Sequence, residues 1–281
     1  MRNILNETIK MNNGLEIPRI GLGTYLMTDP EITKKAIAHA LKNGYKMIDT
    51  ADIYKNHHLV AQAIKEAGIQ REDIFITTKV WVTNFGYDNT IKSVEKMLEE
   101  LNTKYLDLVL LHWPSLKFDK IVESYKALEH LIKQGKIKSI GVSNFMIEHL
   151  TILIKNVEII PAINQVQLHP GLTLLELQQF HNKYNIITES WQTIMKGKVA
   201  EIDLISKLAK KYKVDAAAVA LRWAYQQNIL IIPKSNTPER IITNAKYLES
   251  FELTNSEIDE INNIVIDIKN YTDPYTVNFE K

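Results

Sequence analysis

Short apolar runs recur along the chain, and after each one the apolar positions change from the spacing of a strand to that of a helix. Within residues 31–44 and 120–135, for example, the apolar side chains fall on one helix face before Gly44 and Gly135, which are typical helix ends. The pattern predicts eight strands, at residues 19–25, 46–50, 73–79, 106–112, 137–144, 162–168, 185–190 and 229–235. It predicts helices at residues 31–44, 58–68, 90–101, 120–135, 147–156, 172–184, 203–212, 216–227 and 237–248.

Strict alternation of strands and helices is typical of two α/β architectures, a closed (β/α)8 TIM barrel and an open doubly wound sheet. Eight units without a break in composition favour the barrel, as a single domain over residues 1–281. The segment GLGTY, residues 21–25, lacks the helix start that a dinucleotide-binding glycine loop needs, which weakens the open-sheet alternative. We also expect a short N-terminal hairpin over residues 8–18, turning at Asn13-Gly14 and closing the barrel floor, and a C-terminal helix and tail.

Polar side chains lie at the carboxyl ends of the predicted strands, where the active site of such a barrel is found. These residues are Asp49, Lys79, His112, Ser143-Asn144, Asn164-Gln165, Glu189-Ser190-Trp191 and Lys234-Ser235. Asp49, Lys79 and His112 are separated by about one strand–helix unit each, so we expect them to converge at one mouth of the barrel. Tyr54 follows in the loop after Asp49.

Each of these four residues, taken alone, has an ordinary structural interpretation. A strand-end aspartate is often a helix cap, a lysine usually extends to solvent, and a lone histidine is more often a hydrogen-bonded core residue. Together they favour catalysis, because a buried Asp49 keeps Lys79 charged. We expect that cation to lower the pKa of Tyr54, so that the phenol donates a proton near neutral pH. His112 is then placed to donate a hydrogen bond to a carbonyl oxygen.

The chain resembles the aldo-keto reductase family in the content and order of six motifs: GYKMIDTADIY, ITTKVW, LDLVLLHWP, GKIKSIGVSNF, INQVQLHP and IPKSNTPERI. The resemblance covers nearly the whole chain and is greatest to smaller prokaryotic members, such as 2,5-diketogluconate and glyoxal-type reductases. It implies a (β/α)8 barrel that reduces small aldehydes and ketones with NADPH. It also implies that Asp49, Tyr54, Lys79 and His112 are catalytic, with Tyr54 as the proton donor.

The resemblance further implies a set of cofactor contacts. The residues implied to hold the nicotinamide amide are Ser143, Asn144 and Gln165. The residue implied to stack on the nicotinamide ring is Trp191. The residues in the loop implied to touch the pyrophosphate are Gln192, Ile194 and Lys196. The residues implied to bind the adenosine 2′-phosphate are Lys234, Ser235 and Arg240. The residue implied to bind the adenine is Asn244.

The segment PKSNTPER, residues 233–240, agrees physically with the last assignment. It combines two cations, a hydroxyl and a helix start, which suit a phosphate monoester, although a capped surface helix has the same pattern. We therefore expect NADPH in preference to NADH.

Three stretches depart from the family pattern. Lys55 and His57 occur in YKNHH, where the family has Gly-Asn-Glu after its tyrosine. The segment WQTIMKGK replaces the family's Ser-Pro-Leu-Gly after its stacking aromatic, so that Met195 stands in place of a glycine. Thr243 stands where a glutamate often clamps the adenine. These differences bear on cofactor affinity and loop closure rather than on the chemistry.

Aromatic side chains are expected to form the wall of the substrate site. The candidates are Tyr25, Ile53, Trp81 and Trp113. The alternative role of these residues is packing at the top of the barrel. For Trp113 the sequence supports this role nearly as well as a place in the substrate wall. The tail DPYTVNFEK, residues 273–281, is expected at the rim. Such a pocket accepts many small aldehydes, and nothing in it selects one.

Composition excludes several classes of function. The net charge of +1 over 281 residues gives no support to a nucleic-acid or anionic-membrane partner. The absence of cysteine excludes disulfides and thiolate metal sites. No apolar run approaches the roughly 18 residues of a membrane span, and the N-terminal segment is too polar for a signal peptide. We expect a cytoplasmic monomer without a metal.

Two other functions remain as alternatives. The first is an NADP(H)-binding sensor or regulatory protein of the same fold with weak or lost catalysis, and the unusual YKNHH and WQTIMK loops are its motive. The second is a barrel metallohydrolase that uses His57, His58, His112 or His169. It lacks the usual H-x-H strand signature, and two adjacent helical histidines point apart. His169 is interpreted as structural.

Overall fold

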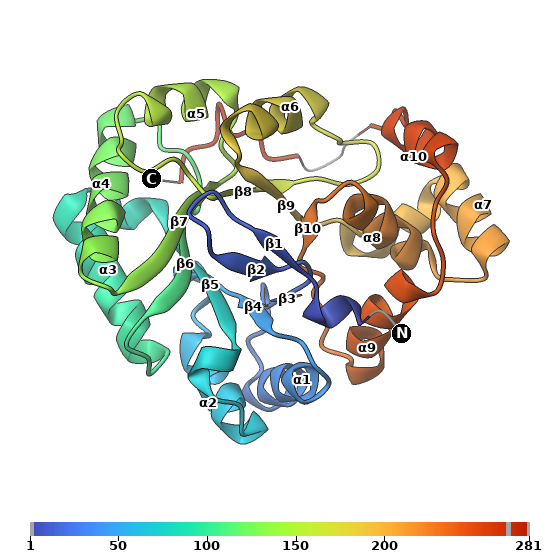
Figure 1. Cartoon of the computed structure of the whole chain (residues 1–281), viewed down its shortest axis with the longest axis horizontal. Coiled ribbons are helices and arrows are strands. Elements are labelled where there is room, and N and C mark those ends of the chain that lie inside the picture. The colour runs from blue at the N-terminus through green and yellow to red at the C-terminus, as the bar shows by residue number, and fades with distance from the viewer. Residues whose placement is uncertain (1–2, 268–270, 280–281) are drawn as a thin grey trace.

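The computed structural model describes residues 3–267 and 271–279. Eight parallel strands follow one another in chain order in one curled sheet, with the helices outside it (Figure 1). These strands are β3 (Leu22–Gly23), β4 (Met47–Asp49), β5 (Phe75–Val80), β6 (Leu106–Leu111), β7 (Ile137–Ser143), β8 (Ile163–Gln167), β9 (Ile187–Trp191) and β10 (Leu230–Ile231). The first and last strands meet, because Ile20 pairs with Ile231 in a parallel bridge and Gly21 N–H donates to the Ile231 carbonyl at 2.9 Å. The predicted (β/α)8 barrel is confirmed.

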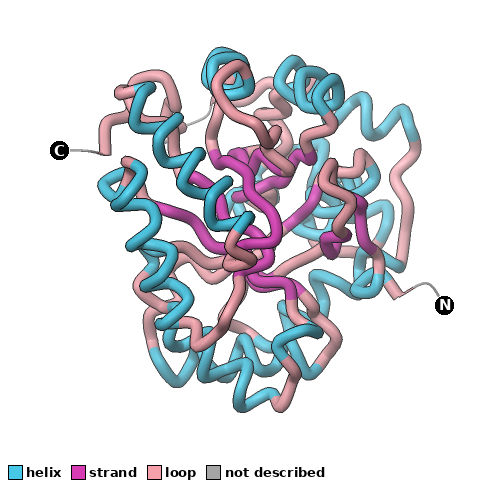
Figure 2. Tube along the Cα trace, turned by 60° about the vertical axis from the view of Figure 1, so that its left-hand side comes forward, coloured by secondary structure: helices cyan, strands magenta, loops and turns pink. Residues whose placement is uncertain are grey.

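The helices form a ring around the strands, which Figure 2 shows as cyan coils around a magenta centre. They are α1 (Pro30–Lys42), α2 (His57–Ala67), α3 (Tyr87–Glu100), α4 (Phe118–Lys133), α5 (Ile147–Ile154), α6 (Leu175–Tyr184), α7 (Asp203–Tyr212), α8 (Ala216–Gln226), α9 (Pro238–Lys246) and α10 (Asn255–Asn262). Three short 3-10 turns follow strands at the barrel mouth: η2 (Asp52–Tyr54), η4 (Val82–Asn84) and η5 (Met195–Glu201). Within residues 3–267 and 271–279, no helix has both the length and the apolar character that a membrane crossing needs.

The predicted N-terminal hairpin is present as β1 (Thr8–Lys10) paired antiparallel with β2 (Glu16–Pro18). Its turn is wider than the expected two-residue Asn13-Gly14 turn, since the Met11 N–H bonds the Leu15 carbonyl and only Gly14 has a positive φ, of 87°. Asn13 instead uses its side chain, whose amide donates to the hydroxyl of Ser139 on β7. The hairpin is thereby fixed to the amino ends of the barrel strands, opposite the mouth.

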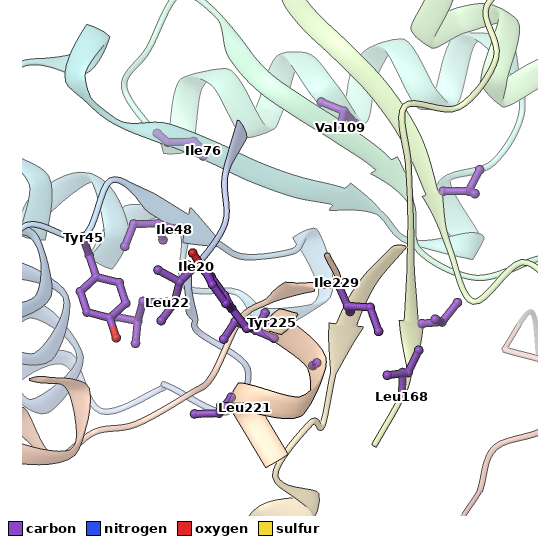
Figure 3. Packing of buried hydrophobic residues seen from close by; sticks show 14 of the residues in the cluster. Ile20, Leu22, Tyr45, Ile48, Ile76, Val109, Leu168, Leu221, Tyr225 and Ile229 are labelled. Atoms are coloured by element: carbon purple, nitrogen blue, oxygen red, sulfur yellow. The ribbon is translucent and has the colours of Figure 1, made fainter. Parts of the chain in front are cut away.

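Two apolar clusters fill the fold, one on each face of the sheet. The larger cluster lies between the strands and the helices, and Figure 3 shows part of it around Ile20, Ile48 and Ile76. The smaller cluster fills the inside of the barrel near its floor: Met11, Ile17, Met47, Leu108, Leu110, Ala162, Ile163, Leu230 and Ile232. Neighbouring residues of a strand alternate between the two faces. The residue two positions beyond an inward apolar residue therefore also points inward, one layer closer to the mouth.

Candidate active site

The alternation along the strands gathers polar side chains in one layer inside the barrel. Met47 of β4 faces the interior cluster, so Asp49, two residues later, points inward above it. Phe75 of β5 packs against the same cluster, and Lys79 lies on its face of the strand four residues later. The same spacing on β8 and β9 brings Gln165 and Glu189 into the layer, where the two are also register partners.

Lys79 and Asp49 form a fully buried ion pair at the centre of this layer. The Lys79 Nζ lies 2.7 Å from Oδ1 and 2.8 Å from Oδ2 of Asp49, and it donates a third bond to the Thr50 carbonyl at 2.8 Å. The Lys79 side chain is 0% exposed and that of Asp49 is 3% exposed. All three ammonium protons therefore have acceptors, which is the condition under which a buried cation is tolerated.

Gln165 joins the pair to a second carboxyl, that of Glu189. Its Nε2 donates to Asp49 Oδ2 at 2.8 Å and to Glu189 Oε2 at 2.7 Å. Glu189 is 0% exposed, and burial together with the charge of Asp49 raises its pKa to about 7. The sequence placed Glu189 at a strand end but gave it no role. Its spacing of two residues from the inward-facing Trp191 is the signal that assigns it to the interior.

Tyr54 lies in η2, at the end of the loop that follows β4. Its ring centroid is 5.3 Å from the Lys79 Nζ and 5.7 Å from the centroid of His112, which it meets edge-on. The expected lowering of the Tyr54 pKa is wrong in sign: burial and the nearby Asp49 carboxylate raise this pKa well above its ordinary value of 10. The main reason is that the phenol is buried, and Lys79 does not offset this burial because it is bonded to Asp49. Tyr54 is thus fully protonated at neutral pH.

His112 stands beside Tyr54 as a neutral imidazole. Burial and the charge of Lys79 lower its pKa well below 6.5. Its ring meets Trp81 edge-on at a centroid distance of 5.2 Å, and its backbone carbonyl accepts a bond from the Asn144 amide at 2.9 Å. The ring Nδ1 is buried and has no partner among residues 3–267 and 271–279. A neutral imidazole with one N–H can donate to a carbonyl oxygen without carrying charge into the site.

Aromatic rings lie close to this pair. Tyr25 is 51% exposed and lies 5.2 Å from Tyr54 between ring centroids. Phe279, from the tail, lies between Trp81 and Trp113, with centroid distances of 5.0 and 5.3 Å. The tail therefore closes one side of the site. The fourth candidate for the substrate wall, Ile53, is 40% exposed next to Tyr54.

The family is decided by comparison with known proteins. A sequence model of the aldo/keto reductase family matches residues 19–266. The chain belongs to the aldo/keto reductase family. It is therefore an oxidoreductase, as its motifs predicted.

Individual relatives of this aldo/keto reductase are similar over nearly their full length. The glyoxal reductase of Bacillus subtilis (strain 168) is 43% identical over 257 residues, which are 92% of each chain. The methylglyoxal reductase DkgA of Yersinia pestis is 40% identical over 252 residues, covering 89% of this chain and 90% of the other. A solved structure of a Gox0644 mutant in complex with NADPH has a TM-score of 0.91 at 36% identity, covering 97% of this chain and 99% of the other.

The residues that the resemblance assigns to the nicotinamide lie next to one another in this reductase. Ser143 Oγ donates to the Gln165 carbonyl at 2.8 Å. Asn144, at a φ of 64°, donates to the His112 carbonyl and accepts a bond from Trp191 Nε1 at 2.9 Å. Asn144 thus already has partners, whereas Oε1 of Gln165 accepts no hydrogen bond from any described residue. The arrangement fits a carboxamide that donates to Gln165.

The loop after Trp191 has an unusual backbone. Gln192, Met195 and Lys196 have φ values of 58°, 49° and 56°, and Gly197 has a φ of 94°. Left-handed conformations cost about 1 kcal/mol or more for residues with a Cβ. Ile194 packs against the large apolar cluster, which anchors the middle of this loop.

The residues assigned to the adenosine phosphate lie at the start of α9. Ser235 Oγ accepts a bond from the Thr237 N–H at 3.0 Å, just before the helix begins. Lys234 and Arg240 are exposed, in the strand–helix loop and in the first turn, and burial lowers the pKa of Lys234. Asn244 is half-buried one turn further along the helix. Cations and free N–H groups at a helix start are suited to a phosphate.

The metallohydrolase alternative finds no support in the residues that the structure describes, where no three histidine or acidic side chains form a group able to hold a metal ion. His57 is buried and bonds Glu100 and Thr78, whereas His58 is exposed, so the two point apart as expected. His169 bonds the Pro170 carbonyl at 2.9 Å, consistent with a structural role.

Proposed function

We propose that this aldo/keto reductase reduces small aldehydes and ketones to alcohols with NADPH, and that Tyr54 protonates the oxygen. The observation that carries the proposal is that the Tyr54 ring lies close to both the Lys79 ammonium, at 5.3 Å, and the His112 ring, at 5.7 Å. Both groups lie at the carboxyl ends of strands, where barrel enzymes place their chemistry. The relatives named glyoxal reductase and methylglyoxal reductase support carbonyl substrates of small size.

Each side chain has a separate part in the proposed reaction. A nicotinamide held by Ser143, Asn144 and Gln165 would supply the hydride for the carbonyl carbon. His112, as a neutral donor, orients the carbonyl oxygen. Tyr54 transfers its phenolic proton to that oxygen as the negative charge develops there. The resulting phenolate lies beside the Lys79–Asp49 pair, with its ring centroid 5.3 Å from the ammonium, so the charge of Lys79 offsets only part of the cost of burying the phenolate.

The raised pKa of Tyr54 is compatible with this role. A proton donor must carry its proton before the reaction, and a raised pKa keeps Tyr54 protonated throughout the physiological range. The cost of forming a phenolate is offset at the moment of transfer by the stronger basicity of the alkoxide. The proposed mechanism therefore does not need the acidic phenol that the sequence led us to expect.

Tyr54→Phe tests the proton transfer. We expect the variant to lose NADPH oxidation with methylglyoxal by about 100-fold or more, because general acid catalysis contributes ~10²–10⁴. NADPH binding, followed by quenching of tryptophan fluorescence, should remain. Tyr87→Phe is the matched control, since Tyr87 is 40% exposed at the start of α3. Full turnover by Tyr54→Phe would exclude Tyr54 as the donor.

The preference for NADPH over NADH is proposed from the start of α9, where Lys234, Ser235 and Arg240 are close together in sequence and exposed cations flank a helix N-terminus. Lys234→Met combined with Arg240→Leu should weaken NADPH binding by ~10-fold to 100-fold, since each charge-assisted bond contributes ~1.5–3 kcal/mol before solvent screening. NADH binding should change by less than about twofold. An equal loss of affinity for NADPH and NADH would show that these cations do not bind the 2′-phosphate.

A second candidate function is a cofactor-binding sensor with weak catalysis, and the position of Phe279 is the observation that favours it. The phenyl ring lies between Trp81 and Trp113, where a substrate would be expected. Stoichiometric NADPH binding without turnover of methylglyoxal, aromatic aldehydes, keto-sugars or short ketones would support the sensor. Turnover of any of them at an ordinary enzymatic rate supports the reductase.

A further inference from the structure

One carboxyl inside the barrel has no part in the proposed reaction. Glu189 is 0% exposed on β9, and its Oε2 accepts a hydrogen bond from Gln165 Nε2 at 2.7 Å. Its other oxygen, Oε1, is buried and has no partner among the residues that are described. Buried polar atoms are normally paired, so an unpaired carboxyl oxygen next to a functional layer calls for an explanation.

The charges of this layer do not balance when Glu189 is ionised. The Lys79 ammonium makes its three hydrogen bonds to Asp49 and Thr50, so its protons are fully used. One cation then faces two buried carboxylates. The titratable groups that act on Glu189 are Asp49 from β4 and Lys79 from β5, while the adjacent strands present the uncharged Gln165 from β8 and Leu230 from β10. A nearby positive charge would restore the balance.

Gln165 connects Glu189 to the proposed nicotinamide site, and its neighbours determine which way its amide group is oriented. Because Asp49 is paired with Lys79, its oxygens only accept, and the Gln165 group that faces them must be the amide nitrogen. The second proton of that nitrogen goes to Glu189. Gln165 Oε1 is therefore held as an acceptor, and the proposed function places the nicotinamide carboxamide there. Glu189 is then separated from the bound nicotinamide by a single side chain.

We propose that Glu189 makes cofactor binding depend on the oxidation state of the nicotinamide: ionised Glu189 favours the positively charged oxidised ring, and neutral Glu189 favours the uncharged reduced ring. The inference rests on the proposed function for the position of the cofactor. Glu189 acts through its charge and through Gln165, so it is a positioning residue rather than a catalytic one. NADP⁺ binding near neutral pH releases a proton from Glu189, and NADPH binding does not.

The size of the effect follows from linkage between proton and cofactor. If the charged ring lowers the pKa of Glu189 by about one unit, NADP⁺ affinity rises by about tenfold relative to NADPH affinity as Glu189 ionises. The burial of Glu189 places this change around neutral pH. The 2′-phosphate also titrates near pH 6, but both cofactors carry it, so it cancels in the ratio of their dissociation constants.

The test measures the dissociation constants of NADP⁺ and NADPH at pH 6 and pH 8 for the wild type, Glu189→Gln and Glu129→Gln. Glu129 is the matched control: it is a buried carboxylate on α4, and its Oε1 accepts bonds from the Glu158 and Ile159 N–H groups. In the wild type and Glu129→Gln, the NADP⁺/NADPH ratio of dissociation constants should fall by about fivefold from pH 6 to pH 8, since this range covers most but not all of the tenfold change. In Glu189→Gln it should change by less than about twofold.

A second measurement needs no variant. Calorimetric titration of the wild type at pH 7, in two buffers of different ionisation enthalpy, should show more proton release with NADP⁺ than with NADPH. A ratio that is independent of pH in the wild type, or that keeps its pH dependence in Glu189→Gln, overturns the role of Glu189. Failure of the wild type to bind either cofactor overturns the proposed function and this inference with it.

Discussion

Replacing only one residue of the buried Lys79–Asp49 pair is expected to lower the free energy of unfolding strongly, whereas replacing both residues is expected to lower it much less. Its Nζ–O distances are 2.7 and 2.8 Å, with side chains 0% and 3% exposed. Lys79→Met leaves the Asp49 carboxylate beside a second carboxyl, with the Gln165 amide as its remaining donor. Asp49→Asn leaves the ammonium with the Thr50 carbonyl and one amide oxygen. Each single change therefore leaves a buried charge without its counter-charge.

The expected magnitudes follow from the depth of burial. Breaking a buried ion pair by removing one partner costs ~3–5 kcal/mol. The double variant carries neither charge and keeps side chains of similar volume, so it should cost much less than the sum of the two. The coupling free energy between Lys79 and Asp49 should then be ~3 kcal/mol or more.

The assay is urea unfolding of the wild type, both single variants and the double variant, monitored by circular dichroism. The control cycle is Lys120→Met with Glu123→Gln on α4, whose Nζ–O distance is 2.9 Å although both side chains are 47% exposed. That exposed pair should give a coupling of ~0.3–0.5 kcal/mol. Similar coupling for both pairs would refute the argument that burial, rather than contact distance, determines the strength of the Lys79–Asp49 pair.

Three further predictions concern stability and selectivity. Folding raises the pKa of Glu189 from 4.5 to about 7, so the wild type loses stability as pH rises through this range. Relative to the wild type, Glu189→Gln should therefore gain ~2–3 kcal/mol between pH 5 and pH 8 in urea unfolding. No relative gain would show that Glu189 is not buried as a neutral acid. Phe279→Ala should raise kcat/KM for bulky aromatic aldehydes by about tenfold relative to methylglyoxal, and an unchanged ratio would exclude Phe279 from the substrate wall. Tyr45→Phe should cost ~1–2 kcal/mol in thermal unfolding, because it removes the donor from the buried Ile241 carbonyl of α9, and a neutral effect would mean that this bond contributes nothing.

The sequence predicted the barrel well because each strand carries its own signal. Apolar runs located all eight strands, and the helix periodicity located the helices between them. The first and last strands are shorter than expected, at Leu22–Gly23 and Leu230–Ile231. Pro233 has no N–H to continue the ladder, and a Cβ on Gly23 would lie 2.8 Å from the Ile232 carbonyl, so these strands meet by close backbone approach. A barrel seam of this kind depends on two distant segments and leaves no local pattern.

The same reasoning located the catalytic candidates, but it did not predict the direction of the Tyr54 pKa shift. Asp49, Lys79 and His112 follow from strand position, because the period of two decides which face a side chain occupies. The sign of the Tyr54 pKa shift depends on which partner Lys79 bonds and on how deeply the phenol is buried. Both are three-dimensional properties, and the ion pair cancels the charge on which the expectation relied. The sequence assigned no role to Glu189 for a related reason. The role of a carboxyl at a strand end depends on the side chains around it in space, which the sequence does not show.

Two residues with a Cβ adopt a left-handed backbone at positions where the family pattern has glycine. Lys55 and Met195 stand where the family pattern has glycine, and both have left-handed φ values, of 55° and 49°. The chain thus keeps the loop conformation that glycine favours and accepts ~1–2 kcal/mol of strain at each position. Lys55 recovers part of this through its bond to Asp52 at 3.2 Å, and Met195 through packing against the large apolar cluster. Both residues therefore keep the left-handed conformation that glycine would adopt without strain, and they add side chains to these loops that glycine lacks.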